Sequence, residues 1–367
     1  MNKHFKIQSI AWLLAVLFFS CRKEPGVIPE ERIQLPNQIT AVNGLYLLNE
    51  GNMGSNKASL DYYDYASGIY RKNIYNEANP AVTLGLGDVG NDIKIYGSRL
   101  YVVVNMSNKV EVLDVKTAKK IGQVEVPNCR YITFYKDKAY VTAYDGYVAV
   151  VDTATLKQTT KINVGQQPAE MAVVGTKLYV ANSGGYNYPN YERTVSVIDL
   201  TTNTELKRID VDVNLHRLKA DQYGDIYVTS RGDYISIPSN LYVIDTKTDL
   251  VKKKFNIAAS EICIHQDFAY VYSVEWSNAT GNNAIAYTKL NVKDETVLPG
   301  NFITDGTDAQ ITLPYGIAID PLSSDIYVTD AKDYVSPGML YCFDKTGKKK
   351  FSVTTGDVPA HLVFYTK

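Results

Sequence analysis

The sequence predicts an all-β fold, a seven-bladed β-propeller with four antiparallel strands in each blade. A tyrosine-centred pattern recurs seven times, and it lies in short apolar runs that are rich in β-branched and aromatic residues and bounded by turn residues. No sustained helical periodicity follows the first 21 residues. A repeat of roughly 40–50 residues with several short strands is typical of propeller blades, because stacked blades bury the sheet faces that a single blade leaves exposed.

Each copy of the repeat has a small aliphatic residue, then tyrosine, then an apolar run. The seven copies begin at Leu45-Tyr46, Leu100-Tyr101, Ala139-Tyr140, Leu178-Tyr179, Ile226-Tyr227, Ala269-Tyr270 and Ile326-Tyr327. Most copies contain a second apolar run that ends in aspartate, as at Asp114, Asp152, Asp199, Asp245 and Asp344. Because Asp and Thr side chains bond their own backbone and start turns, we predict that these aspartates shape hairpins and are not catalytic acids.

The segment at residues 358–365 (VPAHLVFY) resembles the first strand of a copy, but no second strand follows it. We therefore expect it to complete the first blade and to close the ring between the two ends of the propeller. Closure removes an open sheet edge. The predicted propeller spans residues 42–367.

The first 41 residues predict export and anchoring. Residues 1–20 combine basic residues, a nine-residue apolar run (AWLLAVLFF) and a small residue before Cys21, which is typical of a signal peptide. Residues 18–21 (FFSC) resemble a bacterial lipobox, which implies a lipid on Cys21; the alternative is plain secretion. Residues 21–41 then read as the lipidated Cys and a flexible, proline-containing tether. Arg22-Lys23-Glu24 resembles the surface-export signal of Bacteroidetes lipoproteins, which implies an outer-membrane protein facing the extracellular side.

The balance of charges argues against nucleic acid as a partner. With 38 basic and 39 acidic side chains, the net charge of −1 offers no field for nucleic acid. The remaining cysteines, Cys129, Cys263 and Cys342, are far apart without metal-ligand spacing, so we interpret them as buried thiols.

Tyrosine is abundant, with 29 residues against 10 Phe and 2 Trp, and only seven of the tyrosines belong to the repeat. The others need a different explanation.

Three phrases resemble a known family. Tyr179-Val-Ala-Asn, Tyr227-Val-Thr-Ser and Tyr327-Val-Thr-Asp, each followed by a V-x-V-I-D-like strand, look like the YVTN/YncE-type seven-bladed propellers. Residues 47–52 (LLNEGN) and 58–64 (ASLDYYD) resemble a Bacteroidetes branch of surface lipoproteins. One class of that branch, BtuG, captures cobalamin and hands it to a TonB-dependent outer-membrane transporter. Propellers of this branch with other ligands share the same repeats.

No catalytic motif stands out, so we expect a protein that is not an enzyme. Residues 85–90 (GLGDVG) fit G-x-G-x-x-G, but strands follow them where a dinucleotide site needs a helix. Counting back from each repeated tyrosine gives the residue just before each innermost strand: Asp92, Tyr131, Glu170, Arg217, Glu261, Gly316 and His361. This set should ring the channel mouth. Because acids alternate with Arg217 and His361, ion pairing would satisfy them; direct ligand contact by Arg217 and His361 and a metal site are the alternatives.

The loops between the second and third strands of the blades carry the remaining candidates. They combine aromatic rings with amides and one cation, which suits a large, partly flat ligand with polar groups. The candidate ligand-binding residues are Asn105, Tyr144, Tyr147, Asn182, Tyr186, Tyr188, Tyr191, Arg231, Tyr234, Trp276 and Tyr334. The alternative is that these tyrosines are tolerated on a secreted surface.

We therefore expect a non-catalytic surface lipoprotein. By the resemblance, its ligand is cobalamin or another corrinoid and its partner is a TonB-dependent transporter, with no catalytic cofactor and no metal. A glycan or protein ligand for another such system would use the same aromatic face. A propeller enzyme, such as a metal-dependent lactonase or a quinoprotein-like dehydrogenase, is the remaining alternative.

Overall fold

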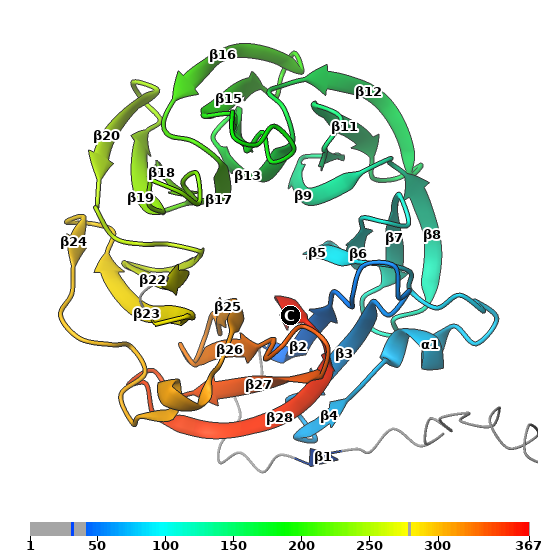
Figure 1. Cartoon of the computed structure of the whole chain (residues 1–367). Coiled ribbons are helices and arrows are strands. Elements are labelled where there is room, and N and C mark those ends of the chain that lie inside the picture. Colours follow the sequence, from blue (N-terminus) through cyan, green and yellow to red (C-terminus); the bar gives the residue numbers. More distant parts are fainter. Residues whose placement is uncertain (1–30, 33–41, 278–279, 367) are drawn as a thin grey trace, which may run out of the picture.

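The computed structural model describes residues 31–32, 42–277 and 280–366, which form a closed ring of seven β-sheets (Figure 1). This is the predicted seven-bladed propeller, with four antiparallel strands in each blade. The predicted signal peptide and Cys21 lie outside the described residues. In the predicted tether, β1 (Glu31–Arg32) pairs with the outer strand of the first blade, β4 (Ile69–Arg71).

Each blade runs from an innermost strand at the channel to an outermost strand at the rim. In that order, the first three blades are β29 (Pro359–Thr366), β2 (Val42–Asn49), β3 (Ser59–Asp64) and β4; β5 (Gly90–Tyr96), β6 (Arg99–Val104), β7 (Lys109–Asp114) and β8 (Lys120–Glu125); and β9 (Cys129–Tyr135), β10 (Lys138–Ala143), β11 (Tyr147–Asp152) and β12 (Lys157–Asn163). The fourth and fifth are β13 (Pro168–Val174), β14 (Lys177–Asn182), β15 (Thr194–Asp199) and β16 (Thr204–Asp210); and β17 (Leu215–Ala220), β18 (Asp225–Ser230), β19 (Asn240–Asp245) and β20 (Leu250–Lys254). The last two are β21 (Glu261–His265), β22 (Phe268–Ser277), β23 (Asn282–Asn291) and β24 (Thr296–Val297); and β25 (Pro314–Ile319), β26 (Ile326–Asp330), β27 (Pro337–Phe343) and β28 (Lys349–Asp357).

Helical structure among the described residues is confined to the short α1 (Ile74–Ala78) and the 3-10 turn η1 (Thr307–Gln310). Neither element is long and apolar enough to span a membrane. The first blade closes the ring as predicted, because β29 pairs with β2 in antiparallel register, for example Leu47 opposite Leu362.

The repeated tyrosine explains why the blades stack. In all seven copies it lies on the second strand of the blade and is at most 3% exposed. Its ring fills the space between blades. In several copies its hydroxyl also has a polar partner: Tyr46 donates to the Val115 carbonyl and Tyr179 to the Asp249 carboxylate, both at 2.6 Å. An aromatic body with a hydrogen-bonding tip is therefore the unit of blade-to-blade packing.

The recurring aspartates lie in hairpins, as predicted. Asp152 accepts hydrogen bonds from the backbone N–H and the hydroxyl of Thr155, both at 2.9 Å, and Asp114 does the same with Thr117. The thiols of Cys129 and Cys342 are buried, whereas Cys263 is partly buried. Burial raises the pKa of Cys129 to about 12, so this thiol stays protonated and packs as an apolar group.

Candidate ligand-binding cavity

The predicted ring residues lie inside the innermost strands and not just before them: six are the third residue of their strand, and Glu261 is the first. Asp92, Tyr131 and Arg217, for example, occupy the third positions of β5, β9 and β17. In six of the seven blades, the register between the first and second strands shifts beside the ring residue, which marks a β-bulge. A bulge lengthens one strand and turns a side chain out of the regular alternation. Counting back from the repeated tyrosines assumed regular pairing between the first and second strands. It therefore did not account for the extra residue in each bulge.

Side-chain hydroxyls hold the bulged backbone. The N–H groups of Tyr131 and Arg217 donate to the hydroxyls of Thr142 and Thr229, each at 3.0 Å, where a regular ladder would have offered a carbonyl. At Gly316, a Cβ would collide with the Ala360 carbonyl oxygen. This ring position therefore has no room for a side chain.

Two carboxylates of the ring join neighbouring blades. Asp92 accepts from the N–H of Ile132 and Glu170 from the N–H of Leu218, both at 3.0 Å. Glu170 also pairs with Lys219. Burial opposes ionisation of Glu170, but the charges of Lys219 and Arg217 prevail and hold its pKa at about 2. These acids are engaged in joining the innermost strands to one another.

The centre of the ring is a network around Tyr131. Arg217 pairs with Glu261 at 2.5 Å and donates from Nη1 to the Tyr131 hydroxyl at 2.9 Å. That hydroxyl lies 3.1 Å from Nε2 of His216. On the first blade, Glu50 accepts from the Tyr315 hydroxyl at 3.0 Å and lies 3.3 Å from Nε2 of His361. Ion pairing within the ring is thus present at Arg217, as the sequence suggested.

A cavity of about 1100 Å³ opens above this network, on the ring axis. Its floor is made by ring residues and their neighbours. Its walls come from segments after the second strand in the first, fifth and seventh blades, and from the ends of β22 and β23 that meet in the sixth. Of the predicted binding residues, it brings together Arg217, Arg231, Tyr234, Trp276 and Tyr334. The volume is slightly above the usual range for small-molecule sites, roughly 300–1,000 Å³.

Three of these residues form an aromatic arc on one wall. Tyr234 and Tyr334 lie in equivalent loops of the fifth and seventh blades. Trp276, which was predicted in a loop, lies on the long strand β22 of the sixth blade. The side chains of Tyr234, Tyr334 and Trp276 are 66%, 47% and 64% exposed, respectively. Large aromatic rings that remain exposed at a cavity have apolar area left to bury against a ligand.

Two loops of the arc have the same construction. The segments 233–236 (DYIS) and 333–336 (DYVS) each place the tyrosine in the left-handed region, with φ of 61° for Tyr234 and 64° for Tyr334. In both, the aspartate accepts from the backbone N–H groups two and three residues later and from the serine hydroxyl. These hydrogen bonds lower the pKa of Asp333 to about 2. Each carboxylate thus stabilises a backbone conformation that is costly for tyrosine.

The long loop of the fourth blade contributes a rim outside the cavity. Tyr186 packs edge-on against Tyr144 at 5.3 Å, and Tyr191 lies between Tyr188 at 6.0 Å and Tyr234 at 6.1 Å. Tyr144, Tyr186, Tyr188 and Tyr191 do not line the cavity, but they continue its aromatic wall outward.

Three predicted binding residues are placed in the interior of blades. Tyr147 is buried on β11, under the ammonium of Lys161. Asn182 donates to the hydroxyls of Thr194 and Ser196, and Asn105 donates to the Cys129 carbonyl at 2.8 Å. These side chains hold the loops from beneath and do not face the cavity. Position next to a loop could not distinguish them from the exposed residues.

Sequence reasoning missed several residues of the floor. Glu50, Arg130, His216 and Tyr315 line the cavity, and Tyr131 was assigned only to the ring. Arg130, His216 and Tyr315 each immediately precede a ring residue, so the available signal was adjacency to the ring in sequence. No group of three or more His, Cys, Asp or Glu side chains among residues 31–32, 42–277 and 280–366 is arranged to hold a metal ion.

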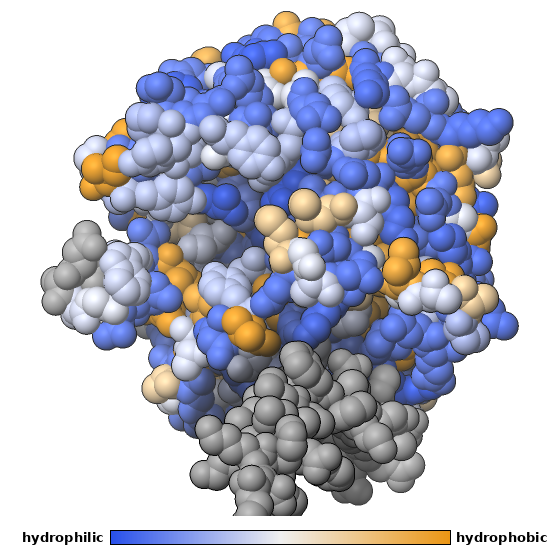
Figure 2. Space-filling view, turned by 45° about the vertical axis from the view of Figure 1, so that its right-hand side comes forward, coloured by the Kyte–Doolittle hydropathy of each residue, from blue (hydrophilic) through white to orange (hydrophobic). Residues whose placement is uncertain are grey.

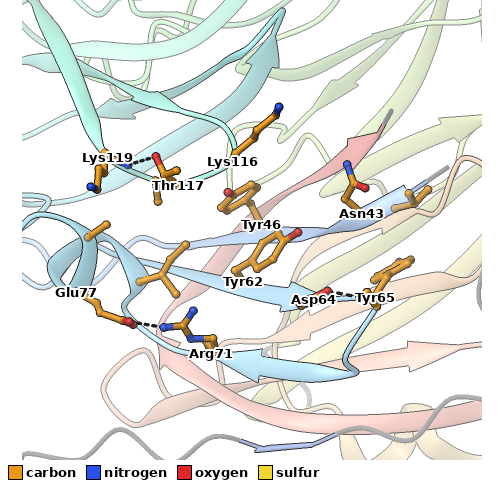
Figure 3. A pocket seen from close by; sticks show the side chains of 15 residues that line it. Asn43, Tyr46, Tyr62, Asp64, Tyr65, Arg71, Glu77, Lys116, Thr117 and Lys119 are labelled. Carbon is orange, nitrogen blue, oxygen red and sulfur yellow. Dashed lines mark hydrogen bonds and ion pairs between the residues drawn. The ribbon is translucent and has the colours of Figure 1, made fainter. Parts of the chain in front are cut away.

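A second pocket of about 690 Å³ lies between the first and second blades, at the ends of the strands opposite the cavity (Figure 3). Its wall includes Tyr46, Tyr62 and the hairpin at residues 116–119, and Arg71 pairs there with Glu77. None of the predicted binding residues belongs to it.

Comparison with known proteins supports the fold. No curated protein matches the chain in sequence. The chain is similar to the solved structure of a quinonprotein alcohol dehydrogenase-like protein from Bacteroides thetaiotaomicron, with a TM-score of 0.65, 17% identity and coverage of 88% of this chain and 78% of that one. It is also similar to hydrazine synthase from Kuenenia stuttgartiensis, with a TM-score of 0.58, 19% identity and coverage of 70% and 76%.

A computationally designed protein, Ika8, is similar over 92% of this chain and 94% of its own, with a TM-score of 0.57 and 12% identity. At these identities the likenesses concern the fold. The sequence pattern of one family, described as "Domain of unknown function (DUF5074)", matches residues 43–365. The chain therefore belongs to the DUF5074 family.

Proposed function

We propose that this propeller is a surface lipoprotein that captures cobalamin or another corrinoid and passes it to a TonB-dependent outer-membrane transporter. The observation that supports capture is the central cavity, where an exposed aromatic arc stands over a floor of polar and charged groups. The choice of ligand rests on the resemblance of residues 47–52 and 58–64 to the BtuG branch.

The chemistry of the cavity suits such a ligand. A corrin is broad, partly flat and edged with amide arms. Tyr234, Trp276 and Tyr334 offer rings for its flat surface, while Arg231 and the floor offer donors and acceptors for its arms. On a preorganised face, each aromatic anchor would contribute about 1–3 kcal/mol.

Capture of this kind needs no bond to be made or broken. Among the described residues, the acids of the ring are already engaged by backbone N–H groups, lysine and arginine. Such carboxylates suit a rigid platform better than a metal-dependent hydrolase. On the face that Figure 2 draws, hydrophobic residues form small separate patches within a hydrophilic surface, so the cavity is the more specific candidate for recognition.

The test is gel filtration of the purified chain with cyanocobalamin, following corrin absorbance in the visible range. Elution of the colour with the protein would support corrinoid capture. Free elution of the dye would contradict corrinoid capture, and a glycan or protein ligand would then be the class to screen.

Lipidation of Cys21 needs a separate test. Globomycin, which blocks cleavage of lipoprotein signal peptides, should cause the uncleaved precursor to accumulate if Cys21 is lipidated.

A further inference from the structure

The cavity floor contains two cations without a counter-charge. Arg217 has Glu261, but the guanidinium groups of Arg130 and Arg231, among the described residues, form no ion pair within 4 Å. Arg130 stacks over the Tyr144 ring at 4.4 Å, and its Nε is buried without a hydrogen-bond partner in the described part of the chain. Arg231 donates from Nη2 to Nε2 of His216 at 2.8 Å. Neutral neighbours therefore hold both cations in place.

The arrangement of His216 fixes its state. Arg231 donates from Nη2 to Nε2 at 2.8 Å, and a guanidinium can only donate. Nε2 is then an acceptor, and the imidazole is neutral with its proton on Nδ1. Burial and the charges of Arg231, Arg217 and Arg130 hold the pKa of His216 well below 6.5. The imidazole is thus surrounded by three guanidinium groups and adds no charge.

The carboxylates of the cavity have other partners. Glu261 pairs with Arg217, Glu50 is held by Tyr315 and His361, and Glu275 accepts from the Ser239 hydroxyl at 2.5 Å. Glu50 interacts electrostatically with Arg130, but the two side chains do not form an ion pair within 4 Å. The numbers of acids and arginines in the lining are equal, yet positive charge without a close partner is concentrated at Arg130 and Arg231.

A partly buried guanidinium without a counter-ion favours binding of an oxyanion, because its N–H groups match the two oxygens of a carboxylate or phosphate. We infer that Arg130 and Arg231 form a subsite for an anionic oxygen group of the captured ligand, whose flat part lies against Trp276 and Tyr334. This inference deepens the proposed function and rests on it where the ligand is a corrinoid. The group is then the phosphodiester of the nucleotide loop.

Two corrinoids separate the contribution of that group. Cyanocobalamin carries the phosphodiester, whereas dicyanocobinamide has the corrin ring without it. Calorimetric titration should show that Arg231→Gln and Arg130→Gln each weaken cyanocobalamin binding by about tenfold or more, and cobinamide binding by less than about threefold. Equal losses for both ligands, or no loss for either, would overturn the subsite. Lys119→Gln removes a cation from the second pocket, between the first and second blades, and should change neither affinity.

A second measurement keeps the subsite distinct from the choice of ligand. If wild-type protein binds neither corrinoid, the proposed ligand is wrong, and the subsite is decided by thermal unfolding in sodium phosphate and sodium acetate against sodium chloride of equal ionic strength. A bound anion raises the unfolding temperature. A rise in wild type that is lost in the Arg130→Gln/Arg231→Gln variant supports the subsite, and the more effective salt identifies the oxyanion. No rise above chloride would refute it.

Discussion

The cavity on the ring axis (the upper cavity) and the pocket between the first and second blades (the lower pocket) contain similar residue types with different roles. Both contain tyrosines and charged side chains. In the lower pocket, Tyr46 is buried and Arg71 has a carboxylate partner, so the residues serve packing between the first two blades (Figure 3). In the upper cavity, large rings are exposed and two arginines have no carboxylate within 4 Å among the described residues.

The difference shows that the presence of a pocket does not by itself indicate function. The lower pocket is bounded by hairpins of the kind that every blade needs, whereas the upper one is bounded by loops that differ between blades. Tyr46 and Arg71 of the lower pocket have partners within the fold, whereas the exposed rings and two arginines of the upper cavity are left with apolar area and bonding capacity. The comparison can be tested by substitutions on each side.

The largest expected effect belongs to the lower pocket. Tyr46→Ala removes a buried ring and its hydrogen bond to Val115, so we expect the free energy of unfolding to fall by about 3–5 kcal/mol. Tyr46→Phe removes only the hydroxyl and should cost about 1 kcal/mol. Urea unfolding measures both. A large loss of ligand affinity in folded Tyr46→Phe protein would reverse the assignment of the two pockets.

The second effect is a pH dependence of stability that originates in the upper cavity. Because burial and nearby arginines lower the pKa of His216, the folded protein keeps this imidazole neutral below pH 6.5 while the unfolded chain takes up a proton. Stability should therefore fall as pH decreases from 6.5, with a contribution approaching about 1.4 kcal/mol per pH unit. His216→Gln should remove that contribution in urea titrations between pH 7 and 5. An unchanged slope would show that His216 titrates normally.

Trp276→Ala should separate binding from stability. The side chain is 64% exposed, so we expect the unfolding midpoint to correspond to a change within about 0.5 kcal/mol. Affinity for the ligand should fall by at least about tenfold, since an aromatic anchor is lost. Trp276→Phe, which keeps a ring, should lose less. Unchanged affinity in calorimetry would remove Trp276 from the site.

A smaller effect is expected from the turn that holds Tyr334. Asp333→Ala removes the acceptor for the N–H groups of Val335 and Ser336, so Tyr334 should leave its left-handed conformation more often. Ligand affinity should fall by about three- to tenfold, equivalent to about 1 kcal/mol. Asp344→Ala breaks a comparable turn at the other end of the strands and should leave affinity unchanged. Equal losses in both variants would indicate a general effect on stability.

Lys116→Gln should have the smallest effect. This lysine is exposed at the edge of the lower pocket, and substitutions of such residues usually change stability by less than about 0.5 kcal/mol. Neither unfolding nor corrinoid titration should distinguish this variant from wild type. A measurable loss of affinity would give the lower pocket a role in binding.

The fold could be predicted from the sequence because the repeat is both local and sevenfold. The buried tyrosine, the hairpin aspartate and the closing strand each follow from patterns within a few residues. The exposure of Tyr234 and Tyr334 at the cavity was also predictable, since they lie in equivalent loops, whereas the loop expected at Trp276 is part of strand β22. Asn182 and Tyr147 show the limit of this reasoning, because burial depends on contacts that are distant in sequence. Arg130 was missed for the same reason, as its lack of a counter-charge emerges only when the blades come together.

Closure of the ring by β29 has a consequence for the order in which the blades are completed during synthesis. His361 lies on β29 and meets Glu50, 311 positions earlier in the chain. A chain emerging from its amino end can build the blades from the second to the seventh one after another, but the first blade stays incomplete until residues 359–366 arrive. The same strand contacts the cavity lining through His361, whose Nε2 lies 3.3 Å from the carboxylate of Glu50. The cavity therefore reaches its final form only when the first blade is complete.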